Sequence, residues 1–107
     1  MKTLKFAPNL VQIIISGEKT STWRLFDDKD LKNGDELVFV EKETGKRFAE
    51  ATITEVRQIK IGDVQASDYD GHEKFESKEK MFETYRSYYG QRVTPDSILK
   101  IIRFKLK

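Results

Sequence analysis

The chain contains no cysteine and only one histidine, His72. Without cysteine, disulfide scaffolds, thiol nucleophiles, iron–sulfur clusters and cysteine-based zinc sites are excluded. A single histidine leaves almost no room for a histidine metal cluster. The six glycines are well separated, so the chain has no glycine-rich phosphate loop. We therefore expect neither a metal ion nor another cofactor.

Long apolar segments are also missing. The longest apolar run, residues 13–15, is far shorter than a membrane span, and the N-terminus lacks the apolar region of a signal peptide. We therefore expect a cytoplasmic protein with no membrane partner. Hydrophobic residues make up 37% of the 107 residues, but seven phenylalanines, four tyrosines and one tryptophan supply large burial areas. These values predict one folded domain spanning residues 1–107.

Charge is almost balanced but unevenly distributed. The chain has 20 Lys and Arg residues and 18 Asp and Glu residues, which gives a net charge of +2. Residues 1–26 and 97–107 are basic, whereas residues 27–96 are acidic. If the two ends pair as neighbouring strands, they form one basic face that suits a nucleic acid. Alternatively, the terminal lysines only keep edge strands soluble.

The hydrophobic pattern alternates between strand and helix periodicity. Pro8 opens one expected helix, and Ser77 can cap another that ends before Gly90. Strands joined by hairpins, with helices at the periphery, predict an α+β fold on a small, mostly antiparallel sheet or barrel. The expected strands are residues 4–6, 21–25, 36–41, 48–61 and 98–106, and the expected helices are residues 9–16 and 77–89.

The stretch from Gly17 to Arg24 concentrates polar side chains where a helix passes into a strand. Alternate side chains of a strand share a face, so Thr20, Thr22 and Arg24 should project together, with Lys19 at the entrance. Two hydroxyls, an ammonium and a guanidinium suit an anionic or carbonyl-rich ligand, because arginine grips phosphate through a bidentate fork. The alternative, which spacing alone favours, is an edge strand whose polar face is simply hydrated.

The segment from residue 71 to residue 90 has structural explanations when it is taken by itself. His72 is typical of a surface or interface histidine, and Glu73 of a solvated carboxylate among other acids. Ser77 is a helix cap. The apolar stripe that includes Tyr85 has the spacing of a helix face turned toward the core.

The spacing Gly17-x-Lys19-x-x-Thr22-x-Arg24 resembles the GxKxxTxR signature of the ASCH (activating signal cointegrator homology) family. The segments 71–77 and 88–90 are also similar to small stand-alone bacterial and archaeal ASCH proteins, so the resemblance covers nearly the whole chain. It implies a PUA-like β-barrel. It also implies a cleft beside the signature that binds RNA or nucleotides.

One branch of that family hydrolyses the acetyl amide of N4-acetylcytidine with a lysine, a threonine and a glutamate. The resemblance places these residues at Lys19, Thr22 and Glu73. Thr22 would be the nucleophile, Lys19 would take its proton, and Glu73 would orient Lys19 or carry the proton to the leaving amine. A lysine base needs a pKa roughly 2–3 units below its usual value of about 10.4. Burial and Arg24 would lower the pKa of Lys19, and a charged Glu73 would raise it.

Two functions follow from this resemblance. The first is an RNA- or nucleoside-binding cleft, in which Tyr69 or Phe75 is expected to stack on a base. The second is metal-independent hydrolysis of an acylated cytidine nucleoside. A row of basic residues near the C-terminus weakly favours RNA, whereas the low net charge favours a small ligand. The expected ligand-binding residues are Lys19, Thr20, Thr22, Arg24 and His72, and the expected catalytic residues are Lys19, Thr22 and Glu73.

Overall fold

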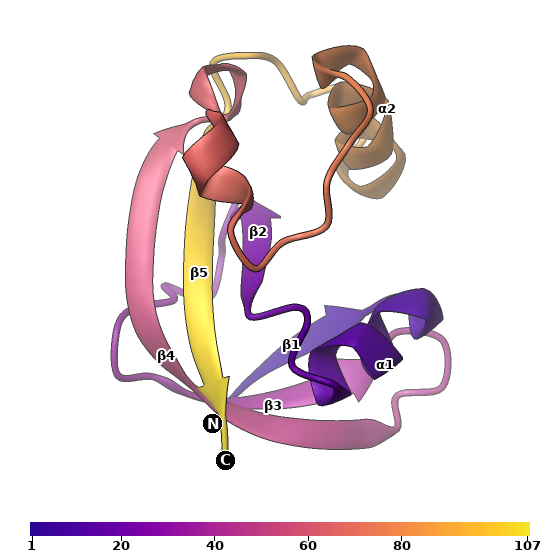
Figure 1. Ribbon diagram of the computed structural model, residues 1–107, viewed down its shortest axis with the longest axis vertical. Coiled ribbons are helices and arrows are strands. Elements are labelled where there is room, and N and C mark those ends of the chain that lie inside the picture. Colours follow the sequence, from indigo (N-terminus) through magenta and orange to yellow (C-terminus); the bar gives the residue numbers. More distant parts are fainter.

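The computed structural model describes residues 1–107 and contains one five-stranded sheet, two α-helices and two short 3-10 helices (Figure 1). The α+β prediction is confirmed. In chain order the elements are β1 (Lys2–Phe6), α1 (Pro8–Ile15), β2 (Ser21–Leu25), β3 (Glu36–Glu41), β4 (Arg47–Lys60), η1 (Ile61–Asp63), η2 (Ala66–Tyr69), α2 (Lys78–Tyr89) and β5 (Ile98–Leu106).

The sheet is a curled half-barrel with strand order β1-β3-β4-β5-β2. Neighbouring strands are antiparallel except β1 and β3, which pair in parallel. The long strand β4 pairs with both β3 and β5, and its register shifts between Ile53 and Glu55. Such a bulge bends and twists a strand, which allows β4 to curl around the molecule (Figure 1). The barrel stays open between β1 and β2, which are the two edges of the sheet.

Two hydrophobic clusters lie on opposite faces of β5. Ile102 and Phe104 belong to a cluster formed with β1, β3, β4 and α1, whereas Leu99 and Ile101 belong to a cluster that includes α2. This division follows from the alternation of side chains along a strand. It leaves the open seam of the barrel between the two clusters.

The predicted helix boundaries are confirmed to within one residue. Pro8 is the first residue of α1. At the start of α2, the Ser77 hydroxyl accepts a hydrogen bond from the backbone N–H of Lys80 (3.1 Å), and Gly90 ends the helix with a φ of 89°. The left-handed backbone at this position suits glycine.

Neither helix is long and apolar enough to cross a membrane.

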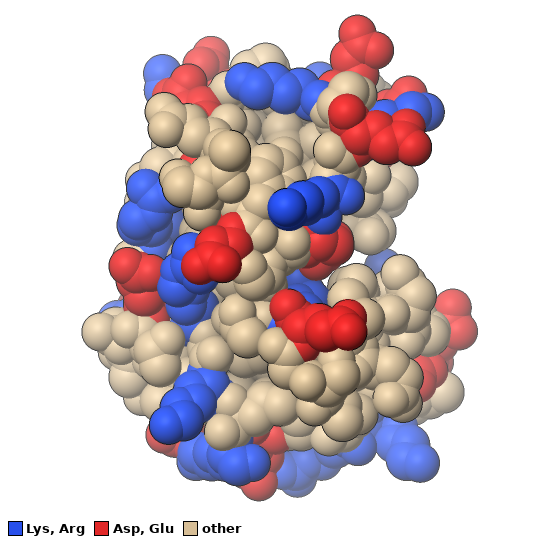
Figure 2. All heavy atoms as spheres, in the orientation of Figure 1, with Lys and Arg blue, Asp and Glu red and all other residues tan.

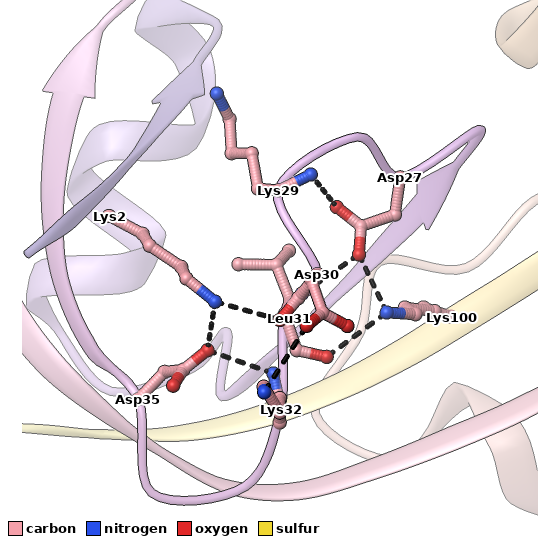
Figure 3. A network of polar contacts seen from close by, with 8 residues as sticks. All are labelled: Lys2, Asp27, Lys29, Asp30, Leu31, Lys32, Asp35 and Lys100. Carbon is pink, nitrogen blue, oxygen red and sulfur yellow. Dashed lines mark hydrogen bonds and ion pairs between the residues drawn. The ribbon is translucent and has the colours of Figure 1, made fainter.

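A buried ion pair fixes the loop between β2 and β3 to the sheet (Figure 3). The Asp27 carboxylate accepts hydrogen bonds from Lys100 Nζ (2.6 Å) and from the backbone N–H groups of Lys29 and Leu31 (both 2.9 Å). Lys100 also donates to the Leu31 carbonyl (3.1 Å). The side chains of Asp27 and Lys100 are 6% and 14% exposed, so the pair is largely shielded from water. The loop is thereby held against β5.

Candidate functional site

A cavity of about 220 Å³ lies at the open seam of the half-barrel. Its wall is formed by β1, α1, β2, the segment before α2, and α2 itself. The Arg24 guanidinium spans the seam: it donates to the Lys5 carbonyl of β1 (3.0 Å) and lies 4.8 Å from the centre of the Phe6 ring. A charged side chain therefore joins β1 and β2 where the sheet is not closed by a hydrogen-bonded ladder.

Lys19 and Glu73 meet in the cavity wall, although 54 residues separate them in the sequence. Lys19 Nζ lies 2.6 Å from Glu73 Oε2. Lys19 is only 3% exposed, whereas the Glu73 side chain is 34% exposed. Glu73 is therefore not only a solvated carboxylate among other acids. Its carboxylate is the counter-ion of a buried lysine.

A short backbone clamp brings Glu73 to Lys19. The Gly71 carbonyl accepts hydrogen bonds from the backbone N–H groups of Thr20 (2.8 Å) and Ser21 (3.1 Å). In Figure 1, the segment between η2 and α2 descends to the start of β2 at this point. Two residues after the clamp, the chain presents Glu73 to the cavity.

Burial governs the electrostatics of the Lys19–Glu73 pair. Burial lowers the pKa of Lys19, with a further contribution from Arg24, and this effect exceeds the opposing attraction to Glu73. Burial also disfavours the ionised form of Glu73, but the charge of Lys19, its hydrogen bond and His72 together outweigh burial and hold the pKa of Glu73 below its usual value. The pKa of Lys19 is therefore nearer to neutral pH than that of a free lysine. The neighbouring Glu73 carboxylate stays ionised.

Thr22 and Arg24 face the same cavity, as strand alternation predicts. Arg24 Nε donates a hydrogen bond to Thr22 Oγ1 (3.2 Å). The buried Thr22 hydroxyl thus acts as an acceptor, and its own proton is available for a ligand or a base.

His72 is buried in the wall and stacks on Trp23, with ring centres 4.1 Å apart and planes 15° apart. Its Nδ1–H donates to the Glu73 carbonyl (2.7 Å). Burial and the charge of Lys19 lower the pKa of His72 to about 4. The interpretation as a surface histidine is therefore wrong. His72 is a neutral part of the wall near pH 7.

Three residues that were expected near a ligand lie outside the cavity lining. Thr20 precedes β2, is exposed, and places its hydroxyl against Gly71. Tyr69 and Phe75 pack against Trp23, with ring centres 5.0 and 6.3 Å away, in the cluster that includes α2. Both aromatic rings therefore support Trp23 from the core side and are not placed to stack on a ligand.

The aromatic wall of the cavity comes from β1, β2 and α2. It contains Phe6, Trp23, Tyr85, Tyr88 and Tyr89. The stripe of α2 was interpreted as core, and Tyr85 is indeed buried, but Tyr88 is 53% exposed at the cavity. The only sequence feature that indicates this wall is the group of tyrosines on α2 that extends beyond its buried residues. No sequence feature indicates that Lys42 also lines the cavity.

No continuous basic face is formed by the two ends of the chain. Strand β2 does pair with β5, but Lys100, Arg103 and Lys107 each contact a carboxylate: Asp27, Glu55 and Glu36 respectively. On the face shown in Figure 2, blue and red side chains are interspersed. Of the basic row Arg103, Lys105 and Lys107, two members are therefore paired with carboxylates, and Lys105 is exposed and forms no ion pair.

Gly71→Ala is expected to displace Glu73, because Gly71 anchors the segment that carries Glu73 to the start of β2. Gly71 has a φ of 72°, and a methyl group at this position would collide with the Thr20 hydroxyl. The left-handed backbone alone costs an alanine about 1–2 kcal/mol. We expect a lower melting temperature and a displaced Glu73, measured by thermal unfolding and by the Glu73 amide NMR signal. Gly45→Ala, also at positive φ but with open space around it, is the matched control. If the Glu73 amide signal is unchanged in Gly71→Ala, the hydrogen bonds of the Gly71 carbonyl do not position Glu73.

No protein-family model and no curated protein matches the chain. Solved structures do. The hypothetical protein PH0355 matches with a TM-score of 0.77 and 20% identity over 100% of both chains. The ASCH domain from Lactobacillus crispatus JV V101 has a TM-score of 0.72 and 17% identity, covering 98% of this chain and 79% of that chain. ASCH from Zymomonas mobilis has a TM-score of 0.68 and 13% identity, covering 96% of this chain and 65% of that chain.

Fold and site together define a small α+β half-barrel with a polar, aromatic-walled cavity at its open seam. The likeness to the two ASCH structures spans nearly the whole chain, and it confirms the PUA-like fold that the signature implied. The chain thus has the ASCH fold. Its identity to these structures is low, so the likeness concerns architecture.

Proposed function

We propose that the cavity binds one nucleoside. The observation that carries this proposal is the Lys19–Glu73 pair in a wall that also contains aromatic rings. A nucleobase presents flat apolar faces together with hydrogen-bond donors and acceptors at its edge. Aromatic rings can stack on the faces, while an ammonium and a carboxylate can pair with the edge.

The size of the cavity and the charge around it favour a small ligand over an extended RNA. Pockets for drug-sized ligands measure about 300–1,000 Å³. At about 220 Å³, this cavity has room for one base and part of a sugar. Affinity for a long RNA depends on several unpaired cations along the phosphate track. The ion pairs of Arg103 and Lys107 remove such a track from β5.

The exposed tyrosine at the cavity provides a test. Stacking on one base contributes about 1–3 kcal/mol. Tyr88→Ala should therefore weaken nucleoside binding by about 5–150-fold without unfolding the protein, because Tyr88 is exposed. Binding can be followed through Trp23, the only tryptophan, which lines the cavity.

Ile98→Ala is the control, because Ile98 is an exposed apolar residue outside the cavity lining. Saturable quenching by a nucleoside that is weakened only in Tyr88→Ala supports the proposal. If no nucleoside changes the emission or gives binding heat at millimolar concentration, the proposal fails.

A second candidate function is hydrolysis of an amide on the bound nucleoside, and two observations favour it. Burial lowers the pKa of Lys19, and the Thr22 hydroxyl proton has no acceptor within the protein. In this reaction Thr22 Oγ1 forms a bond to the amide carbonyl carbon as Lys19 takes its proton. The C–N bond then breaks, and the amine leaves with a proton delivered through Lys19 and Glu73. Water finally hydrolyses the acyl-threonine and regenerates the hydroxyl.

N4-acetylcytidine is the substrate that tests this candidate. Thr22→Val keeps the shape of the side chain but removes the nucleophile, so we expect cytidine release to disappear. Thr3→Val, at an exposed threonine of β1 outside the cavity lining, should have wild-type activity. Release of cytidine at the same rate by Thr22→Val would exclude the covalent route.

A further inference from the structure

The cavity lining contains more positive than negative charge. Lys19, Arg24 and Lys42 are cationic, and Glu73 is the only carboxylate in the lining. His72 does not add charge near pH 7, because burial lowers its pKa to about 4. Since Glu73 is paired with Lys19 at 2.6 Å, the charges of Arg24 and Lys42 have no counter-ion in the wall.

Arg24 has hydrogen-bonding capacity left for a ligand. A guanidinium carries five N–H donors. Arg24 uses its Nε for Thr22 and its Nη2 for the Lys5 carbonyl, and both acceptors are uncharged. No carboxylate lies within ion-pair distance of it, in contrast to Lys100, Arg103 and Lys107 on β5. A partly buried guanidinium without a carboxylate is well suited to receive an anion from outside.

Lys42 provides the second charge from the other side of β1. It lies just after β3, is exposed, and forms no ion pair. Its backbone N–H donates to the Phe6 carbonyl (2.8 Å), while Arg24 lies over the ring of the same Phe6. The Lys42 ammonium lies 5.9 Å from the centre of the Tyr88 ring on α2. Lys42 and Arg24 are therefore both placed beside Phe6 at the rim of the cavity.

We infer that the ligand is a nucleoside monophosphate whose phosphomonoester lies between Arg24 and Lys42. This inference rests on the proposed nucleoside site. A phosphomonoester carries close to two negative charges at pH 7, which matches two unpaired cations, whereas a phosphodiester within an RNA carries one. Arg24 and Lys42 are the only cations of the cavity lining without a carboxylate partner, which suits one terminal group and is too few for a run of phosphates.

The inference is tested by comparing ligands that differ only in phosphate. Adenosine, cytidine, guanosine and uridine, their 5′- and 3′-monophosphates, a dinucleoside monophosphate and inorganic phosphate are titrated against the wild type. The readouts are Trp23 fluorescence and calorimetry. We expect one monophosphate to bind about tenfold or more tightly than its nucleoside, with an advantage that declines as salt increases. The 5′- and 3′-isomers identify the position of the phosphate.

Lys42→Gln and Lys46→Gln form a matched pair of variants. Lys46 lies on the same hairpin and is exposed, but it forms no ion pair and does not line the cavity. In Lys42→Gln, the ratio of the affinity for the monophosphate to the affinity for its nucleoside should fall most of the way to one. Lys46→Gln should behave as the wild type.

The possible outcomes separate this inference from the proposed function. If nucleosides bind but the monophosphates bind no better, or if Lys42→Gln keeps the full advantage, the phosphate subsite is overturned and the nucleoside site stands. If inorganic phosphate binds and depends on Lys42 while no nucleoside contributes affinity, the subsite stands and the nucleoside function fails. If nothing binds, both are overturned.

Discussion

Lys19→Met is expected to slow turnover or weaken ligand binding by about tenfold or more while leaving the folded state at least as stable as the wild type. The Lys19 ammonium is buried, and burial lowers its pKa, which means that the charged form is held in an unfavourable environment. Methionine fills similar space without a charge. Glu73 loses its partner, but its side chain is 34% exposed and can be hydrated. A residue that is kept at a cost to stability serves the site.

The two sides of this prediction are measured separately. If the protein hydrolyses an amide, removal of the proton acceptor should lower the rate by about 10²–10⁴-fold. If it only binds, the loss of a charge-assisted hydrogen bond should weaken binding by about tenfold or more. Lys105→Met, an exposed lysine on β5, is the control. Destabilisation of Lys19→Met by about 3–5 kcal/mol, the cost of breaking a structural buried pair, would show that the pair supports the fold.

Asp27→Ala is expected to destabilise the protein by about 3–5 kcal/mol, because it leaves the Lys100 ammonium largely buried without its counter-ion. Two backbone N–H groups of the β2–β3 loop also lose their acceptor. Chemical denaturation measures this loss, and the adjacent exposed Asp28→Ala is the matched control. A loss below about 1 kcal/mol, as for an exposed ion pair, would contradict the role of the network in Figure 3.

The same pair predicts how stability depends on pH. Burial opposes ionisation of Asp27, but the hydrogen bonds from Lys100 and the loop backbone outweigh it and lower its pKa. A carboxylate with a lowered folded-state pKa stabilises the protein above its unfolded pKa of about 3.9, and this contribution is lost as the pH falls through the folded value. The free energy of unfolding should therefore decrease below about pH 4. Asp27→Asn should show a smaller decrease over that range.

Much of the fold could be predicted from local patterns. Three strands, β2, β3 and β5, have the expected boundaries because apolar runs and flanking turns define them. The start of α2 follows from Ser77 and its end from Gly90. The parallel pairing of β1 with β3 was not predicted, since it joins strands that are distant in sequence and no turn signal specifies it.

The site could be predicted only in part. Strand alternation placed Thr22 and Arg24 on one face with Lys19 at the entrance, and the resemblance added Glu73. Thr20 was assigned to the same row, but β2 begins one residue later. Lys42 lines the cavity because β1, β3 and α2 come together at the seam. The periodicity of the sequence does not predict such tertiary contacts. A basic face was predicted from the two ends of the chain. The acidic residues that pair with the C-terminal strand lie far away in the sequence, so their effect could not be foreseen.

Amide chemical-shift mapping shows whether the seam between β1 and β2 is the ligand site. Uniformly labelled protein is titrated with the nucleosides and their monophosphates. We expect the perturbed amides to be those of the cavity wall, above all Lys19, Trp23, Glu73 and Tyr88, together with the Trp23 indole. Perturbations confined to the outer face of β4 and β5, or spread evenly along the basic residues, would contradict it.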